Sequence, residues 1–368
     1  MKVVFNPGPA FWDERVRRYA GWLIVYDLMK AALEDLGFEL YIPNIPAEMI
    51  DAQTTVSKIT TWDLGAASQL PQDVDLFLGV PGYSLAQIMT LKARRNPPKV
   101  VTVVFNNADW WRDRQLQAEY QAYGRPYDMS PAWRWINTKA LEISDLVIAC
   151  SPFVKKTHAT LVPEEKIAIV PWGVDSIKFA PDWEWQMKNP RPLRVLFAGS
   201  DPVRKGLAYL LIAMKGMEGA ELTIVGTDAK VEIGGIKITS MGMIPNEEMP
   251  AAMRHHHVIC IPTLEDGIAM VVQEGMASGL VPIATPDAAE VFNDPLFTSR
   301  SDVGFAVGFR DPPAIRRHLE WLRDHPAERL EMARDAREIA EKQKWETFKQ
   351  GIAGTIQRLV GRDNNGTA

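Results

Sequence analysis

The feature that most constrains this chain is a strand–loop–helix–strand pattern between residues 258 and 285. The apolar run Val258–Ile261 is long enough for one buried strand and ends at Pro262. The apolar periodicity of Ala269–Ala277 predicts a helix, which Gly279 terminates, and Val281–Ala284 predicts the next strand. Strands that alternate with helices in this way are typical of α/β folds.

Two acidic residues stand eight positions apart in this pattern. Asp266 lies in the loop, and Glu274 lies about two turns into the helix, at roughly 3.6 residues per turn. Gly267 lets backbone N–H groups face a ligand, and the N-terminus of a helix favours an anion. The pattern therefore predicts a ligand site, although by itself it also fits a solvated acidic loop before a core helix.

Composition limits the classes of protein to consider. The length of 368 residues suggests two domains, and 46% hydrophobic and 24% charged residues are ordinary for a globular protein. A net charge of -5 gives no attraction to nucleic acid, so no such partner is expected. The chain shows no signal-peptide pattern at its start, and Cys150 and Cys260, its two cysteines, fit a reducing compartment. We expect a cytoplasmic location, with membrane contact that is at most peripheral to the inner face.

The first half of the chain shows the same alternation of strands and helices. A helix is predicted over about Arg15–Leu36. The strand predicted over Lys99–Phe105 is followed by the polar and aromatic segment 106–111, and ligands of doubly wound sheets bind at the carboxyl ends of strands. An ordinary turn with an inward-packed tryptophan explains that segment equally well. Strands are predicted at Lys2–Phe5, Phe38–Ile42, Val74–Val80, Lys99–Phe105 and Asp145–Ser151.

A strand and a basic loop open the second half. After the polar, proline-rich stretch Asp182–Pro192, the run Leu193–Ala198 predicts a strand, and the loop that follows ends in Arg204-Lys205-Gly206. Forked guanidinium donors suit phosphate oxygens, and fixed cations stabilise developing negative charge. The alternative is a basic helix start whose side chains lie in water.

These motifs together resemble a known family. Asp266, the triplet Gly267-Ile268-Ala269 and Glu274 resemble the donor-sugar signature of GT-B glycosyltransferases, in particular the retaining glycosyltransferase family 4 (glycosyl transferases group 1). The usual first acid of that signature is Glu, and Asp266 replaces it here. Ser200 stands where the family has an Arg, and the family's histidine near residue 109 is missing. Further matches in the same order are Gly173-Val174-Asp175, Gly199 with Lys205-Gly206, Val225-Gly226 and Gly242-Met243-Ile244.

The resemblance implies an α/β GT-B fold, in which two Rossmann-like domains face each other across an interdomain cleft. It implies a first domain over 1–180, a linker over 181–192 and a nucleotide-sugar-binding domain over 193–344. A final helix over about 345–361 would pack back on the first domain, and 362–368 would be a polar tail.

The same resemblance implies transfer of a sugar, with retention, from a UDP-, GDP- or ADP-sugar to an acceptor hydroxyl. Lys205, helped by Arg204, would neutralise the diphosphate, and Glu274 would hold the ribose hydroxyls. Asp266 and the backbone N–H groups of 267–270 would hold the donor sugar. No permanent cofactor and no metal ion are implied. The other donor-side residues implied are Gly8, Gly199, Ser200, Met243, Ile244, Ile268, Ala269, Met270 and Val271.

On the acceptor side, the resemblance favours the loop after residue 105. Its asparagine and aspartate side chains would bind sugar hydroxyls and its tryptophan would stack on a sugar; these residues are Asn106, Asn107, Asp109 and Trp110. The acceptor itself stays open between a glycan, a lipid-linked sugar and a small molecule. An aromatic and basic group near the start suits either a lipid surface or packing on its own domain: Phe11, Trp12, Arg15, Arg17, Arg18 and Trp22.

Two other functions remain open at this stage. A GT-B epimerase would use the same nucleotide-sugar cleft without an acceptor. A non-catalytic nucleotide-sugar-binding or scaffold subunit would explain the departures at Ser200 and Asp266. A metal site at His255-His256-His257 is not expected, because three consecutive side chains point in different directions.

Overall fold

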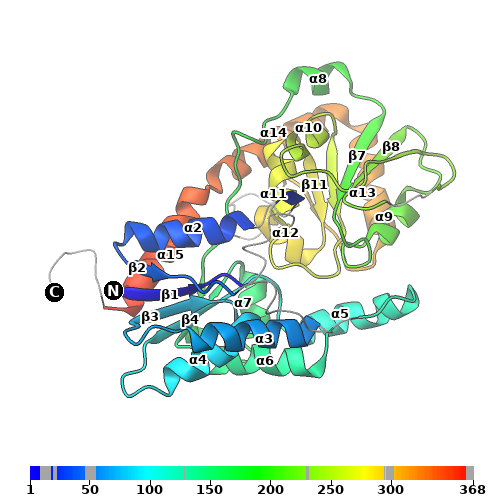
Figure 1. Cartoon of the computed structure of the whole chain (residues 1–368). Coiled ribbons are helices and arrows are strands. Elements are labelled where there is room, and N and C mark those ends of the chain that lie inside the picture. Colours follow the sequence, from blue (N-terminus) through cyan, green and yellow to red (C-terminus); the bar gives the residue numbers. More distant parts are fainter. Residues whose placement is uncertain are drawn as a thin grey trace. The chain divides into compact units, whose positions relative to one another are not determined.

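The computed structural model describes residues 1–8, 18–19, 23–45, 55–127, 129–228, 232–293, 295 and 302–361. By their packing these residues form two compact units (Figure 1). The first unit takes its residues from 1–111, 128–171 and 346–368, and the second from 112–127 and 172–345. Residues 172–180 thus group with the second unit, whereas the sequence analysis expected the first domain to extend to residue 180.

The first unit is built on a parallel six-stranded sheet in the order β2-β1-β3-β4-β5-β6. Most of its strand residues are buried, which explains why the sequence shows continuous apolar runs there rather than an alternating pattern. The strands are β1 (Lys2–Asn6), β2 (Glu39–Tyr41), β3 (Leu76–Gly79), β4 (Lys99–Val104), β5 (Leu146–Ala149) and β6 (Ile167–Ile169).

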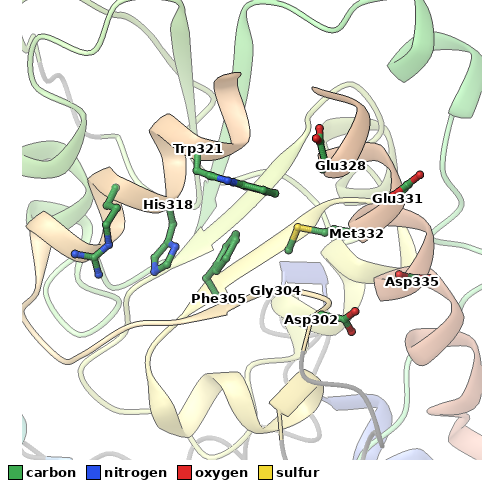
Figure 2. A pocket seen from close by; sticks show the side chains of 10 residues that line it. Asp302, Gly304, Phe305, His318, Trp321, Glu328, Glu331, Met332 and Asp335 are labelled. Carbon is green, nitrogen blue, oxygen red and sulfur yellow. The ribbon is translucent and has the colours of Figure 1, made fainter. Parts of the chain in front are cut away.

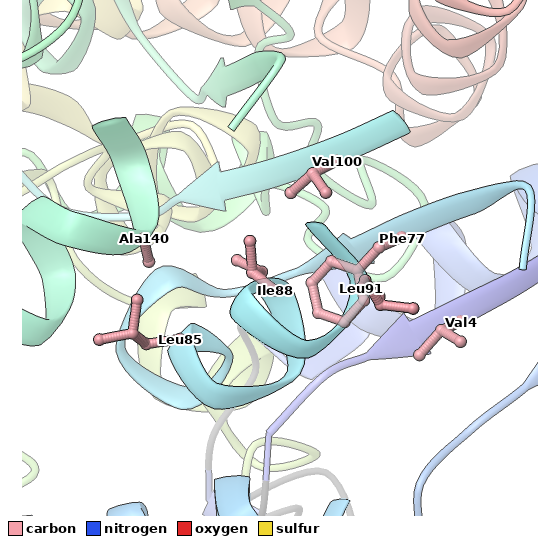
Figure 3. Packing of buried hydrophobic residues seen from close by; sticks show 7 residues of the cluster. All are labelled: Val4, Phe77, Leu85, Ile88, Leu91, Val100 and Ala140. Atoms are coloured by element: carbon pink, nitrogen blue, oxygen red, sulfur yellow. The ribbon is translucent and has the colours of Figure 1, made fainter. Parts of the chain in front are cut away.

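Helices cover both faces of this sheet (Figure 1). Helices α3, α4 and α6 lie together on one face and α2 lies on the other. Figure 3 shows the core between α4, α6 and the strands, where Val4, Phe77, Ile88, Leu91 and Val100 meet with almost no exposed surface. The helices are α2 (Ile24–Asp35), α3 (Thr55–Ser68), α4 (Leu85–Lys92), α6 (Pro131–Glu142), α7 (Pro152–His158), the start of α5 (Asp109–Ala122) and most of α15 (Trp345–Leu359), with short 3-10 turns η4 (Pro81–Tyr83) and η5 (Glu164–Lys166).

The second unit repeats the architecture with the strand order β12-β11-β10-β7-β8-β9, again all parallel. The strands are β7 (Leu193–Ala198), β8 (Ala220–Val225), β9 (Lys237–Ser240), β10 (Val258–Ile261), β11 (Val281–Ala284) and β12 (Phe305–Ala306). The helices are α8 (Trp183–Lys188), α9 (Leu207–Met214), α10 (Met249–Arg254), α11 (Met270–Ala277), α12 (Pro286–Asn293), α13 (Pro312–Asp324) and α14 (Pro326–Lys342).

Most expected elements are present. Strand β12 is limited to Phe305–Ala306, because it pairs with β11 at only two positions. The helix expected over Arg15–Leu36 is described from Ile24 to Asp35 as α2, and Arg15 lies outside the described residues. The expected tail, 362–368, also lies outside them.

The stretch expected to be a linker, 181–192, contains helix α8. Asp182 caps this helix, and the Gln186 side chain donates a hydrogen bond of 2.8 Å to the carbonyl of Gly279. Because Gln186 is buried by this contact, the stretch is an ordered part of the second unit rather than a free connection.

Gly275 allows α11 to pack closely on β10. A Cβ at this position would lie 2.7 Å from Ile259 Cγ2 and 2.9 Å from Ile259 Cβ. We expect Gly275→Ala to lower the free energy of unfolding of the second unit by about 1–3 kcal/mol, because overpacking outweighs the better helix propensity of alanine. Urea denaturation would measure this. Gly354, a partly buried glycine of helix α15, is the control. Gly354→Ala should be neutral or stabilising, because the nearest atom to the new Cβ would be 3.5 Å away. Equal effects of the two substitutions would contradict the packing argument.

Candidate functional site

The candidate site lies where the strand order of the second sheet reverses. From β7 the chain first proceeds to β8 and β9, then returns to place β10 against the other side of β7. Ligands of open parallel sheets bind at such a switch point, beyond the carboxyl ends of the strands. The loop 199–206 follows β7 and the loop 262–269 follows β10, so the sheet brings the predicted basic and acidic motifs together.

Lys205 and Asp266 form an ion pair between these two loops. The Nζ atom of Lys205 contacts Asp266 Oδ2, and both side chains are largely buried. Burial lowers the pKa of Lys205 and works against ionisation of Asp266. The charges of Lys205 and Arg204 outweigh that effect at the carboxyl group and hold the pKa of Asp266 below its ordinary value. The pair therefore joins the loop after β7 to the loop after β10.

Arg204 faces three acidic residues rather than open solvent. Its Nη1 atom donates to the backbone carbonyl of Glu265 at 3.0 Å and lies 3.8 Å from Glu265 Oε2 and 3.7 Å from Asp266 Oδ1. Its Nε atom lies 3.9 Å from Asp201 Oδ2. Although burial opposes its charge, these carboxylates raise the pKa of Arg204 above its usual value. The guanidinium is thus held in place at the base of the loop.

Two glycines bring the loops this close. Gly206 has a left-handed backbone (φ +72°), and a Cβ there would lie 2.0 Å from the carbonyl oxygen of Pro262. A Cβ at Gly199 would lie 2.7 Å from Lys205 Cγ. The two glycines that matched the family pattern therefore make room for the loop contact and for the stem of the lysine.

Asp287 supports the acidic loop from the end of β11. Its Oδ2 accepts a hydrogen bond of 2.8 Å from the backbone N–H of Asp266, and its Oδ1 accepts one of 2.9 Å from Ala288. Burial, with the charge of Asp266 adding to it, raises the pKa of Asp287 well above its usual value. Through these two hydrogen bonds Asp287 fixes the position of the acidic loop.

Glu274 lies within α11, buried and apart from the ion pairs. The described residues include no hydrogen-bond or ion-pair partner for its carboxyl group within bonding distance. Burial raises its pKa to about 8, and Lys178 only partly opposes this. A buried carboxyl group with a strongly raised pKa is costly for the fold, and such groups mark candidate ligand sites.

Met243 and Ile244 lie at the same edge of the sheet. The backbone N–H of Gly226 donates to the carbonyl of Gly242 at 2.7 Å, and Gly199 donates to Val225 at 2.9 Å. These bonds join the ends of β7 and β8 to the segment before Met243. Met243 and Ser200 are both exposed there.

The predicted site residues of the first half lie in the first unit. Gly8 follows β1, has φ +80° and donates from its N–H to Asn6 Oδ1 at 2.9 Å. Asn107 is buried, with its Oδ1 facing Thr157, so it supports its own loop. Asp109 accepts a bond of 2.8 Å from Asn137.

Asn106, in the loop after β4, and Trp110, in the first turn of α5, are the exposed members of this group. The Trp110 indole N–H donates to Thr160 Oγ1 at 2.9 Å, while 39% of the residue's surface is exposed. Of the four residues predicted on this side, these two present the larger surfaces to ligands. The aromatic group near the start lies outside the described residues except for Arg18.

Several charged residues of the site were not predicted from the sequence. Glu265, whose side chain is completely buried, lies 3.4 Å from Arg112 Nε through its Oε2 atom. Asp201 accepts a hydrogen bond from the Tyr120 hydroxyl. Asp201 directly follows Ser200 and Glu265 directly precedes Asp266, so their positions beside predicted residues could have indicated them. Nothing in the local pattern around Arg112 or Tyr120 indicated their position in the second unit.

Two of the three consecutive histidines, His256 and His257, are buried in the second unit. His257 accepts from the backbone N–H of Arg194 through Nδ1 and donates through Nε2 to the carbonyl of Asn189 at 2.9 Å. Burial lowers the pKa of His256 to about 4 and that of His257 to about 3. Within the described ranges, no group of three or more His, Cys, Asp or Glu side chains is arranged to hold a metal ion.

In the same part of the chain, no helix has both the length and the hydropathy needed to cross a membrane.

A separate pocket of about 610 Å³ lies elsewhere in the second unit, between β12, α13 and α14 (Figure 2). Phe305 stacks on His318 with a centroid distance of 4.1 Å, and Trp321 meets Phe305 edge-on at 6.0 Å. Glu328 and Glu331 of α14 line the opposite side. None of its lining residues belongs to the cluster around Lys205.

Comparison with solved structures identifies the fold of the whole chain as GT-B. Sucrose-phosphate synthase from Thermosynechococcus elongatus has a TM-score of 0.77 at 16% identity, and the match covers 98% of this chain and 100% of that chain. HepE from Anabaena, solved with UDP and glucose, has a TM-score of 0.63 at 14% identity over 97% of this chain and 99% of that chain. WaaG, a glycosyltransferase of lipopolysaccharide biosynthesis, has a TM-score of 0.66 at 14% identity over 97% of this chain and 99% of that chain.

Sequence comparison finds similarity to glycosyl transferases. Residues 192–325 match the family model "Glycosyl transferases group 1". An MMP α-(1→4)-mannosyltransferase from Mycolicibacterium hassiacum is 32% identical over 138 residues, which are 34% of this chain and 32% of the relative. The D-rhamnosyltransferase WbpZ from Pseudomonas aeruginosa is 23% identical over 256 residues, 66% of this chain and 62% of the relative. The chain thus spans about a third and about three-fifths of the two curated relatives, and the family segment contains Lys205, Asp266 and Glu274.

Proposed function

We propose that this protein is a retaining glycosyltransferase that moves a sugar from a nucleotide-sugar donor to an acceptor hydroxyl. The observation that carries the proposal is the arrangement at the switch point of the second sheet. There the buried Lys205–Asp266 pair joins the loops that follow β7 and β10. Glu274 is buried in α11, and the described residues provide no hydrogen-bond or ion-pair partner for its carboxyl group. The match of residues 192–325 to group 1 glycosyl transferases supports it independently.

In this proposal the cations serve the leaving diphosphate. The charge on a departing nucleoside diphosphate grows in the transition state, and preorganised cations in a site with little water stabilise it strongly. Lys205 exchanges Asp266 for the diphosphate when the donor binds. Ser200 stands where the family has an arginine, and Arg204 provides the guanidinium group in its place. Asp201 and Glu265 fix the position of Arg204. These side chains supply the countercharge, so we propose a metal-independent reaction.

The acids and backbone amides serve the rest of the donor. Once Lys205 turns to the diphosphate, Asp266 accepts hydrogen bonds from hydroxyls of the donor sugar. The backbone N–H groups of 267–270 lie at the start of α11, where the helix dipole favours the negative end of a ligand. Glu274 accepts hydrogen bonds from the ribose hydroxyls, and Met243 and Ile244 contact the base.

The acceptor reacts on the face from which the diphosphate leaves, so the anomeric configuration is retained. A leaving-group oxygen takes the proton of the acceptor hydroxyl as the new glycosidic bond forms. Trp110 and Asn106 are the residues of the first unit that we assign to the acceptor. A reducing, cytoplasmic location belongs to the proposal, because Cys150 and Cys260 are both buried and form no disulfide.

The test is a panel of UDP-, GDP- and ADP-sugars, read by thermal shift and by release of free sugar. A donor at a hundred times its Kd adds about 2.7 kcal/mol, which for a unit of this size raises Tm by roughly 5–10 °C. The shift should vanish in Lys205→Met and persist in Lys188→Ala, which removes an exposed lysine that pairs with Glu184. Turnover without an acceptor that yields an isomerised nucleotide sugar would favour the epimerase, and binding without any turnover would favour the scaffold subunit. If no donor shifts Tm, the proposed function is wrong.

A further inference from the structure

The second unit includes a segment of helix α5, residues 112–122, whose side chains reach the acids around Arg204. Arg310 anchors this segment: its Nε donates to Glu119 Oε1 at 2.6 Å, and its Nη1 and Nη2 donate to the side chain and the backbone carbonyl of Gln115. Tyr209 of α9 donates to the same Glu119 oxygen at 2.6 Å. The segment is therefore fixed at several points.

The backbone at Arg310 supports the importance of this anchor. Arg310 has φ 60°, and among the described residues it is the single non-glycine residue with a left-handed backbone. Such a conformation is unfavourable for a side chain larger than that of asparagine and persists where the surrounding contacts hold it. Here those contacts are the three hydrogen bonds to Gln115 and Glu119.

The anchored segment shares both acids that hold Arg204. Glu265 Oε2 lies 3.4 Å from Arg112 Nε and 3.8 Å from Arg204 Nη1. Asp201 accepts the Tyr120 hydroxyl at the oxygen that lies 3.9 Å from Arg204 Nε, and its other oxygen accepts the backbone N–H of Arg204 at 3.2 Å. Each acid thus contacts both α5 and Arg204.

We propose that Arg112, aided by Tyr120, is a positioning residue for the diphosphate clamp: by sharing Glu265 it keeps Arg204 available to a nucleoside diphosphate. The proposal rests on the proposed function. Glu265 is completely buried, and a buried carboxylate needs compensation by a nearby cation. With Arg112 in place, that compensation is divided between two guanidinium groups. Without Arg112, Glu265 draws Arg204 more strongly, and the diphosphate must compete with it.

Calorimetric titration with the nucleoside diphosphate that binds the wild type tests this role. We expect Arg112→Met to raise its Kd about tenfold, because Arg204 becomes committed to Glu265. The same substitution in the Glu265→Gln background should change the Kd by less than about twofold, because the neutral amide no longer competes for Arg204. Arg114→Met is the matched control: Arg114 is exposed on the same helix, and its loss should leave the Kd unchanged.

The background dependence separates positioning from the other roles. An equal loss of affinity in both backgrounds would mean that Arg112 contacts the ligand itself and would overturn the proposal, as would no loss in either. Partial recovery of affinity by Arg112→Lys supports it, since a lysine restores the charge beside Glu265.

Failure of the proposed function remains distinguishable from failure of this inference. If UDP, GDP and ADP all fail to bind the wild type, the proposed function is wrong. The coupling of Arg112 and Arg204 through Glu265 is then measured by thermal unfolding without ligand. The effects of Arg112→Met and Arg204→Met on Tm should then be non-additive with Glu265 present and additive in the Glu265→Gln background. Additivity in both backgrounds would overturn the inference.

Discussion

Lys205→Met is expected to destabilise the second unit by about 3 kcal/mol and to abolish donor binding. Removal of one partner of a buried ion pair leaves the other charge uncompensated, which typically costs about 3–5 kcal/mol. Arg204 Nη1, 3.7 Å from Asp266 Oδ1, reduces this cost. Loss of a charge-assisted contact to the diphosphate should weaken nucleotide binding about 10- to 100-fold. Urea denaturation and nucleotide titration measure the two effects.

The double variant Lys205→Met/Asp266→Asn separates folding from function. It removes both charges of the pair, so most of the lost stability should return, because the desolvation of an unpaired carboxylate is gone. Donor binding should stay lost, because neither the cation nor the acid is restored. Recovery of binding together with stability would show that Lys205 acts only through the fold, and it would contradict the assigned role.

Glu274→Gln is expected to change the pH dependence of both stability and donor binding. The pKa of Glu274 is raised from 4.5 to about 8 by burial, so the folded protein keeps this proton between about pH 4.5 and 8 while the unfolded chain releases it. As the pH rises through this window, the free energy of unfolding of the wild type should therefore fall relative to that of Glu274→Gln. The fall is at most about 1.4 kcal/mol per pH unit. Denaturation curves of the two proteins at matched pH values give this difference directly.

The comparison with the variant is necessary because other buried groups titrate in an overlapping pH range and change the free energy of unfolding in the opposite direction. Burial lowers the pKa of His158 and of His256 to about 4, so they stay neutral in the fold and add stability as the pH rises toward the ordinary pKa of 6.5. These contributions are the same in both proteins and cancel. A constant difference between wild type and variant across the window would show that Glu274 is not protonated in the fold.

Donor binding gives the second readout of the same residue. An ionised carboxylate accepts hydrogen bonds from ribose hydroxyls better than a protonated one, so donor affinity should rise with pH from about 7 to above 8 in the wild type. Nucleotide sugars suit this measurement, because a terminal phosphate with its own pKa of about 6 would complicate it. The Glu274→Gln protein should bind more weakly, with an affinity that does not depend on pH in this range.

The sequence predicted the sheets well for a physical reason. Strands such as Val258–Ile261 and Val281–Ala284 are buried on both faces, so each appears as an uninterrupted apolar run with bounds that the structure reproduces. Lys205 and Asp266 each follow such a strand directly. Their meeting therefore depends only on the strand order and on the shared edge of a parallel sheet.

Other parts of the site depend on contacts that local patterns do not encode. The guanidinium of Arg204 lies among Asp201, Glu265 and Asp266, and the sequence pattern did not indicate these contacts. Charge pairing of this kind is set by the direction of long side chains from separate loops. The grouping of residues 112–127 with the second unit is likewise a property of tertiary packing.

The first unit is discontinuous, and this has a consequence for the order in which a growing chain can fold. Helix α15 contributes Lys349, which pairs with Asp35 of α2 at 2.5 Å, and Gly351, which packs on Val170. At a translation rate of about 5–20 residues per second, α15 emerges from the ribosome about 10–40 seconds after residues 1–171. During that interval the surface formed by α2 and the end of β6 is not covered by α15. Every segment of the second unit, in contrast, has already been synthesised when α15 begins. The nascent first unit therefore keeps this surface uncovered until the last helix has been synthesised.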